Sequence, residues 1–161
     1  MSAGDSFWTK VNKAGPMVDG RPELGPCWIW TRATIKGYGA VTVQRRKWYA
    51  HRYAWTLLRG PIPAGTVLDH FVCFRPLCVN PDHLQPVTHR QNMENRAGLN
   101  SNNASGVRGV HWDRDRKKWM VTVKVAGRSR YGGRFEDKAE AEQAAIKLRS
   151  EMMSHNLRDR A

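Results

Sequence analysis

Long apolar runs are absent from this sequence of 161 residues. No stretch approaches the roughly 18 consecutive apolar residues that a membrane-spanning helix needs. The first ten residues, MSAGDSFWTK, also lack the basic segment and apolar core of a secretion signal. Cysteine is scarce as well, and three is an odd number that disfavours a disulfide framework. We therefore expect a soluble, intracellular protein with no membrane partner.

Acidic residues are few: 14 Asp and Glu stand against 27 Lys and Arg, which gives a formal net charge of +13. Such an excess favours a polyanionic partner. A disordered basic arm would have the same charge, but the sequence also contains seven Trp, four Tyr and four Phe. This aromatic content predicts folded modules that bind a polyanion.

One segment interrupts the chain, AGLNSNNASG from Ala97 to Gly106. Its small polar residues and glycines favour turns and cannot form a core. We predict a first domain over residues 1–97, a linker over 98–105, a second domain over 106–155 and a tail over 156–161.

In the first domain, the segments Cys27 to Thr31 and Tyr38 to Val43 predict a β-hairpin. Apolar residues from Ala50 onward recur at helical spacing, and Gly60 followed by Pro61 predicts the end of that helix.

Further along, Val67 and Leu68 predict a strand, and the run from Leu84 to Val87 predicts a second one after a loop. Thr88 and Gln91 have the spacing of a capping box and predict a helix that extends to about Ala97. The expected order is strand, loop, strand, helix.

In the second domain, apolar and polar residues alternate from Trp119 to Val125, which predicts a strand with one packed face. A turn at Ala126 and Gly127 leads to a strand from Ser129 to Phe135, and Asp137 caps a predicted helix. These elements predict a three-stranded sheet packed on one helix.

Three potential metal ligands are evenly spaced, with four residues between Cys73 and Cys78 and four between Cys78 and His83. Zinc prefers four such ligands in a tetrahedron. The remaining cysteine, Cys27, is the natural fourth ligand. The alternative is that these residues are buried free thiols and a core histidine. We expect a structural zinc ion.

Several segments together resemble the HNH endonucleases, specifically the phage and intron-homing type of the His-Me finger superfamily. The resemblance covers roughly Phe7 to Arg96. The segments that carry it are LDH, CVNPDHL and THRQNMENR, preceded by FWTKV, CWIW, GYG, AHRYA and GPIPAG.

The resemblance implies a ββα-metal nuclease domain in which two strands and a helix grip one divalent cation. His70 matches the general base that activates the attacking water, and imidazole chemistry suits that role. Asp69 and Asn92 match the ligands of the cation, for which Mg²⁺ or Mn²⁺ fits the oxygen donors. Catalytic residues are thus expected at Asp69, His70 and Asn92, and His51 is expected to pack or to contact phosphate.

The sequence departs from the family pattern at one place. The central Asn position of the family, which steadies the loop and the base, corresponds here to His83 or to the neighbouring Asn80. His83 also completes the cysteine spacing, so zinc could replace the hydrogen bonds of that Asn. Both assignments remain open at this point.

Residues 105–152 resemble the APETALA2/ERF-type DNA-binding domain through GVRG, the tryptophan pair, Gly-Arg-Phe and the Ala-rich helix. The resemblance implies a sheet in the major groove of double-stranded DNA, where Arg can bind guanine and Lys can bind phosphate. The expected contact residues are Arg108, Trp112, Arg114, Lys118, Thr122, Lys124, Arg128, Arg130 and Arg134.

The sequence thus predicts an α+β protein, with a zinc-stabilised ββα-metal nuclease domain followed by a small three-stranded antiparallel sheet packed on one helix. The leading hypothesis is a homing-type endonuclease that nicks DNA in the cytoplasm or nucleoid of a host cell, as a monomer or weak dimer. It would leave 5′-phosphate and 3′-hydroxyl ends. The alternatives are a non-catalytic DNA-binding regulator and a module that binds single-stranded RNA.

Overall fold

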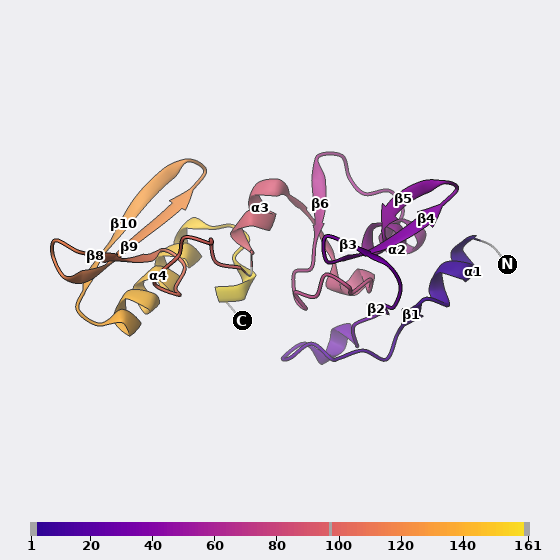
Figure 1. Cartoon of the computed structure of the whole chain (residues 1–161), viewed down its shortest axis with the longest axis horizontal. Helices are drawn as coiled ribbons and strands as arrows, with labels where there is room; N and C mark the ends of the chain where they lie inside the picture. Colours follow the sequence, from indigo (N-terminus) through magenta and orange to yellow (C-terminus); the bar gives the residue numbers. More distant parts are fainter. Residues whose placement is uncertain (1–2, 97, 160–161) are drawn as a thin grey trace. The chain divides into compact units, whose positions relative to one another are not determined.

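The computed structural model describes residues 3–96 and 98–159. The chain forms two compact units, Met1–His89 and Arg90–Ala161 (Figure 1). The two units therefore meet in the sequence between His89 and Arg90, whereas the sequence predicted a linker at residues 98–105. Residues 1, 2 and 97 of the predicted first domain, and residues 160 and 161 of the predicted tail, lie outside the described part.

The first unit begins with short elements. Helix α1 (Ala3–Trp8) precedes strand β1 (Val11–Asn12), which pairs antiparallel with β2 (Ile29–Trp30). Strand β4 (Tyr38–Val43) lies between β3 (Thr34–Ile35) and β5 (Arg46–Tyr49).

The predicted hairpin between the segments of β2 and β4 is therefore wrong. Two tight turns decide the pairing of β4: Lys36 and Gly37 have φ values of 51° and 83°, and Gln44 and Arg45 have values of 48° and 64°. Two consecutive residues with positive φ fit the short hairpin turns whose twist matches that of the strands. Strand β4 thus finds partners on both sides among its immediate neighbours in the sequence.

Helix α2 (Ala50–Arg59) ends at Gly60, which has a φ of 84°, as predicted. Its buried face joins an apolar cluster with aromatic residues from other segments. The buried members of this cluster are Phe7, Trp30, Val41, Ala50, Tyr53, Ala54 and Val79.

The predicted order of strand, loop, strand and helix is confirmed. Strand β6 (Thr66–Asp69) pairs antiparallel with β7 (Gln85–Thr88), and the 3-10 helix η2 (Pro81–His83) lies in the loop between them. Helix α3 (His89–Glu94) follows β7 directly. It is shorter than expected, because a turn at Asn95 replaces the helical extension.

In the second unit, β8 (Val110–Asp113), β9 (Lys118–Val125) and β10 (Arg128–Phe135) form an antiparallel sheet with β9 in the middle. Helix α4 (Lys138–Met152) packs against this sheet, as predicted (Figure 1).

The cap and the core of this unit also follow the sequence pattern. The Asp137 carboxylate accepts hydrogen bonds from the backbone N–H groups of Ala139 and Glu140 and thereby begins α4. Val121 and Val123 of β9 share an apolar cluster with Ala145 and Leu148 of α4. Among the described residues, no helix combines the length and the apolar character required to cross a bilayer.

Candidate functional site

The four predicted zinc ligands lie together in the first unit. Their donor atoms, three Sγ atoms and one imidazole nitrogen, all lie within 4.8 Å of one another. His83 Nδ1 is 3.5 Å from Cys27 Sγ and 3.4 Å from Cys78 Sγ. In a tetrahedral zinc site with bonds of about 2.3 Å to sulfur, neighbouring ligand atoms lie about 3.8 Å apart. This Cys/His cluster, consisting of Cys27, Cys73, Cys78 and His83, therefore has the donors and spacing of a zinc site.

The protonation of His83 also fits a metal ligand. Its Nε2 lies 3.2 Å from the carbonyl oxygens of both Leu24 and Gly25. Carbonyl oxygens only accept hydrogen bonds, so Nε2 carries the proton and donates it. Nδ1 then has a free lone pair directed at the sulfur atoms. A second ring nitrogen held by a carbonyl is the usual support of a histidine that ligates zinc.

The cysteines differ in acidity because of their contacts. A hydrogen bond from Cys78 lowers the pKa of Cys73 to about 5. The same contact raises the pKa of Cys78, and burial raises that of Cys27. One thiolate is thus favoured even without a metal, and a bound cation would favour the other two.

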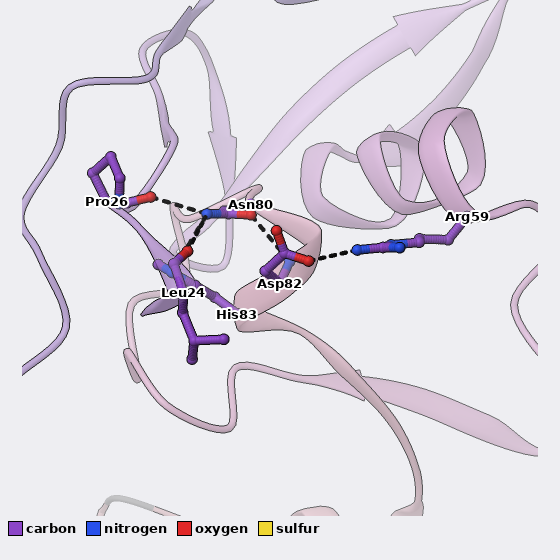
Figure 2. Close-up of polar contacts among 6 residues, drawn as sticks. All are labelled: Leu24, Pro26, Arg59, Asn80, Asp82 and His83. Atoms are coloured by element: carbon purple, nitrogen blue, oxygen red, sulfur yellow. Dashed lines mark hydrogen bonds and ion pairs between the residues drawn. The ribbon is translucent and has the colours of Figure 1, made fainter. Parts of the chain in front are cut away.

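Hydrogen bonds of the Asn80 side chain stabilise the loop that carries Cys78 and His83 of the Cys/His cluster (Figure 2). Its Nδ2 donates to the carbonyl oxygen of Pro26 at 3.0 Å, and its Oδ1 accepts the backbone N–H of Asp82 at 3.0 Å. Asp82 in turn pairs with Arg59 at the end of α2. Asn80 therefore has the loop-steadying contacts, while His83 belongs to the Cys/His cluster.

Asp69 and His70 lie at the end of β6, where Asp69 is the last residue of the strand and pairs with Gln85. His70 is buried, and its Nε2 is 3.0 Å from the carbonyl oxygen of Cys78. Nε2 must donate to this carbonyl, so the lone pair of the neutral ring is on Nδ1. Burial lowers the pKa of His70, which keeps the ring neutral and able to accept a proton.

Two aromatic rings lie beside His70, and a third lies beside one of them. The centroid of His51, at the start of α2, is 5.0 Å from that of His70, and Tyr38 lies at 6.1 Å. Tyr49 stacks on His51 with a centroid distance of 5.8 Å. The His51 side chain is buried, and burial lowers its pKa to about 3. We call His51, His70, Tyr38 and Tyr49 the ring cluster.

The close packing of β4 next to the ring cluster depends on Gly39. A Cβ atom at Gly39 would lie 2.6 Å from the Trp30 ring and 2.9 Å from the Cβ atom of Ala50. Only glycine lets β4 approach Trp30 and the start of α2 so closely. The GYG segment therefore has a packing role beside the ring cluster.

Asn92 lies on α3, and from Arg90 onward this helix belongs to the second unit. Contacts within that unit hold the end of the helix. Arg108 donates to the carbonyl oxygen of Glu94 at 2.7 Å, and the Glu94 carboxylate accepts from Ser154 Oγ and His155 N. Arg108, expected to contact DNA, thus has its guanidinium bonded within the protein.

The register of the sheet divides the expected DNA contacts between its two faces. Thr122 and Lys124 lie opposite the buried Val121 and Val123, on the face away from α4. Lys118 and Arg134 share that face, as does Tyr131, which pairs with Thr122 and is 55% exposed. Tyr131 was not among the DNA contacts predicted from the sequence. Facing residues in an antiparallel pair lie on the same side of the sheet.

Arg128 pairs with Val125 and Arg130 pairs with Val123, so both arginines lie on the same side of the sheet as the valines. Trp112 pairs with Trp119 on that side as well. Arg114 lies in the turn after β8 and is exposed.

Two of the cations on the face away from α4 have acidic partners. Lys118 Nζ lies 3.2 Å from a Glu136 carboxylate oxygen, and Arg134 Nε lies 2.9 Å from Asp113. Within the described ranges, Lys124 has no ion pair. A cavity of about 370 Å³ adjoins Thr122 and Lys124 and is also lined by Arg90 and Arg96. Arg96 was not among the DNA contacts predicted from the sequence.

Comparison with known proteins gives a family match that covers part of the chain. Residues 48–94 match the family model described as HNH endonuclease, so the chain has an HNH endonuclease family domain from the end of β5 to the end of α3. The matched segment includes Asp69, His70 and Asn92.

The similar curated proteins come from bacteriophages. Protein 3.8 of Escherichia phage T7 is 33% identical over 78 residues, which cover 48% of this chain and 63% of that protein. The uncharacterized gene 5.3 protein of Enterobacteria phage T3 is 34% identical over 50 residues, covering 31% of this chain and 48% of that protein. The chain therefore spans less than two thirds of either relative. No solved structure matches it significantly.

Proposed function

We propose that this protein is a metal-dependent DNA endonuclease of the homing type that hydrolyses a phosphodiester bond with His70 as general base. The observation that carries the proposal is the hydrogen bond from His70 Nε2 to the Cys78 carbonyl oxygen, at 3.0 Å, within the HNH family segment. This bond leaves Nδ1 as the basic nitrogen.

In the proposed reaction, His70 Nδ1 takes a proton from a water molecule, and the water oxygen attacks the scissile phosphorus. The bond from phosphorus to the 3′ oxygen breaks as the new bond from phosphorus to oxygen forms. The 3′ oxygen then takes up a proton from solvent. The products are a 5′-phosphate and a 3′-hydroxyl end, and one active site per chain produces a nick.

Asp69 and Asn92 are the proposed ligands of a catalytic Mg²⁺ or Mn²⁺ ion, because carboxylate and amide oxygens suit these hard cations. When bound, such an ion stabilises the negative charge that develops on the phosphate and on the leaving oxygen. The Cys/His cluster would instead hold a structural zinc ion, and Asn80 would take the central loop-steadying role of the family pattern.

The second unit is the proposed DNA-binding module, similar to an APETALA2/ERF domain. The support for this part is the sheet and its charges, since the family match ends before β8. We assign the DNA-contacting surface to the sheet face away from α4. It consists of Lys118, Thr122, Lys124, Tyr131 and Arg134.

The remaining expected contacts would be peripheral. Trp112, Arg128 and Arg130 lie on the other side of the sheet, Arg114 lies in a turn, and Arg108 is bonded to α3. The phage origin of the relatives supports action inside an infected cell. We further propose that the protein acts as a monomer or weak dimer.

A plasmid assay tests the proposal. Supercoiled plasmid with a selected target site is incubated with the protein in Mg²⁺ or in EDTA, beside the His70→Ala variant. We expect Mg²⁺-dependent nicking that falls by at least about 10²-fold in the variant, with unchanged DNA binding. Tight binding without cleavage by the wild type would instead identify a non-catalytic DNA-binding regulator.

A further inference from the structure

His51 has a buried ring nitrogen that the fold leaves without a partner. The residue is only 6% exposed, and its Nδ1 has almost no accessible surface. No described residue forms a hydrogen bond with this nitrogen. A buried polar atom without a hydrogen-bond partner destabilises a fold, and native proteins contain few of them. This one lies beside the proposed general base.

The environment of Nδ1 fixes where the proton of His51 lies. Burial keeps the ring neutral, since it lowers the pKa to about 3. A neutral imidazole has one N–H group and one lone pair. A proton on Nδ1 would be a buried donor without an acceptor. We therefore place the proton on Nε2 as part of the proposal below.

The neighbours of His51 indicate what Nε2 can bind. His51 and His70 are both buried, whereas Tyr38 and Tyr49 are each 37% exposed. The ring cluster thus has two neutral imidazoles beside two partly exposed phenols. Within this cluster, the N–H group of His51 and the O–H groups of the two tyrosines are uncharged donors that can bind an anion. The N–H group of His70 is already bonded to the Cys78 carbonyl oxygen, and its lone pair stays available for proton transfer.

We propose that His51 is a second imidazole of the nuclease site, which donates its Nε2–H to a non-bridging oxygen of the phosphodiester that His70 acts on. This inference rests on the proposed function and adds a substrate-binding residue to it. His51 holds the phosphate in place, and the bonds that form and break are unchanged.

Two substitutions of His51 distinguish the effect of its N–H group from the effect of its aromatic ring. His51→Phe keeps an aromatic ring against His70 and removes the N–H group, whereas His51→Gln loses the ring and keeps an N–H group near the position of Nε2. We expect His51→Phe to lower the single-turnover cleavage rate by about 10²-fold, as for other lost donors to a reacting oxyanion. His51→Gln should recover most of the rate. Zinc content and thermal unfolding serve as controls for folding.

Cleavage by His51→Phe at the wild-type rate, or equal losses in both variants, would overturn the proposal. Imidazole ¹⁵N NMR gives a readout that does not need cleavage. It should show a proton on Nε2 of His51 and a change in the Nε2 signal when a 12-base-pair DNA duplex is added in EDTA. A proton on Nδ1, or no change with the duplex, would also overturn the proposal. If the wild-type protein does not cleave DNA but the NMR spectra show the expected Nε2 proton and signal change, the proposed nuclease function is wrong. The assignment of His51 as a phosphate-binding residue is then still supported.

Discussion

The two units of the chain have different kinds of core. The second unit has two strands of eight residues and a helix of 15, and apolar side chains fill the space between them. In the described part of the first unit, three of the seven strands have only two residues, and long loops separate β1 from β2 and β6 from β7. Four of its buried or partly buried side chains are the thiols and imidazole of the Cys/His cluster.

This difference indicates which interactions stabilise each unit. Long regular elements bury enough apolar surface to hold a small sheet and helix together. The first unit has an apolar cluster of its own, but long loops make up much of it, and small domains commonly gain stability from a metal. The Cys/His cluster joins Cys27, beside β2, to the loop before β7. The proposed zinc site and the proposed general base are also linked, because Cys78 belongs to the cluster and its carbonyl oxygen accepts a hydrogen bond from His70.

The largest expected effect follows from removing a ligand of the cluster. Cys78→Ser should abolish zinc binding and unfold the first unit, because structural zinc sites contribute about 10–16 kcal/mol of apparent binding free energy. The second unit should remain folded. Amide ¹H–¹⁵N NMR spectra of the full chain would detect this directly. Loss of dispersed signals from β8 to α4 as well would contradict the separation of the two cores.

A substitution in the core of the second unit should affect only that unit. Leu148→Ala removes a buried side chain between α4 and the sheet and should lower the free energy of unfolding of the second unit by about 2–5 kcal/mol. Zinc content should not change. Leu99, which is 45% exposed in the same unit, provides the control, since Leu99→Ala should change stability by less than about 0.5 kcal/mol. Denaturant unfolding followed by NMR measures both.

A smaller effect is expected where the first unit is packed most closely. Gly39→Ala places a methyl group 2.6 Å from the Trp30 ring and should destabilise this unit by about 1–3 kcal/mol. Gly98→Ala is the control, because no described residue other than its chain neighbours has an atom within 4 Å of the added Cβ. Equal stability of the two variants, measured by thermal unfolding, would refute the packing role of Gly39.

The smallest predicted effect concerns pH. His51 has an ordinary pKa of 6.5 in the unfolded chain and a pKa of about 3 in the folded one, because burial disfavours the charged ring. The unfolded state therefore binds the extra proton, and stability falls as the pH decreases from about 6.5 toward 3. The slope from this residue is at most about 1.4 kcal/mol per pH unit. His51→Phe should reduce the slope for the first unit, whereas replacing the exposed His111 should not. Urea unfolding at pH 7, 6 and 5 tests this.

Much of the secondary structure followed from the sequence because periodicity reports which face of an element is buried. The alternation from Trp119 to Val125 predicted β9 and its packed side, and Gly60 predicted the end of α2. The even spacing of Cys73, Cys78 and His83 predicted the loop part of the cluster, and Cys27 was the remaining cysteine.

Other features depend on information that periodicity does not contain. The partners of β4 were set by positive φ values at Lys36 and Gln44, which are not typical residues for such turns. The separation of Arg128 and Arg130 from Lys124 could have been found from the predicted turn at Ala126 and Gly127, because a two-residue turn fixes the register. The unpartnered Nδ1 of His51 has no sequence signal, since it arises from contacts across the fold.

The zinc content of the full chain, purified without chelator and measured by elemental mass spectrometry, tests the central claim most directly. If zinc stabilises the first unit and apolar packing stabilises the second, the wild-type chain should contain one zinc ion. The ion should be lost in Cys78→Ser and retained in Leu148→Ala. A fully folded wild-type protein with no zinc would contradict the account, because the first unit would then be stable without the ion assigned to its core.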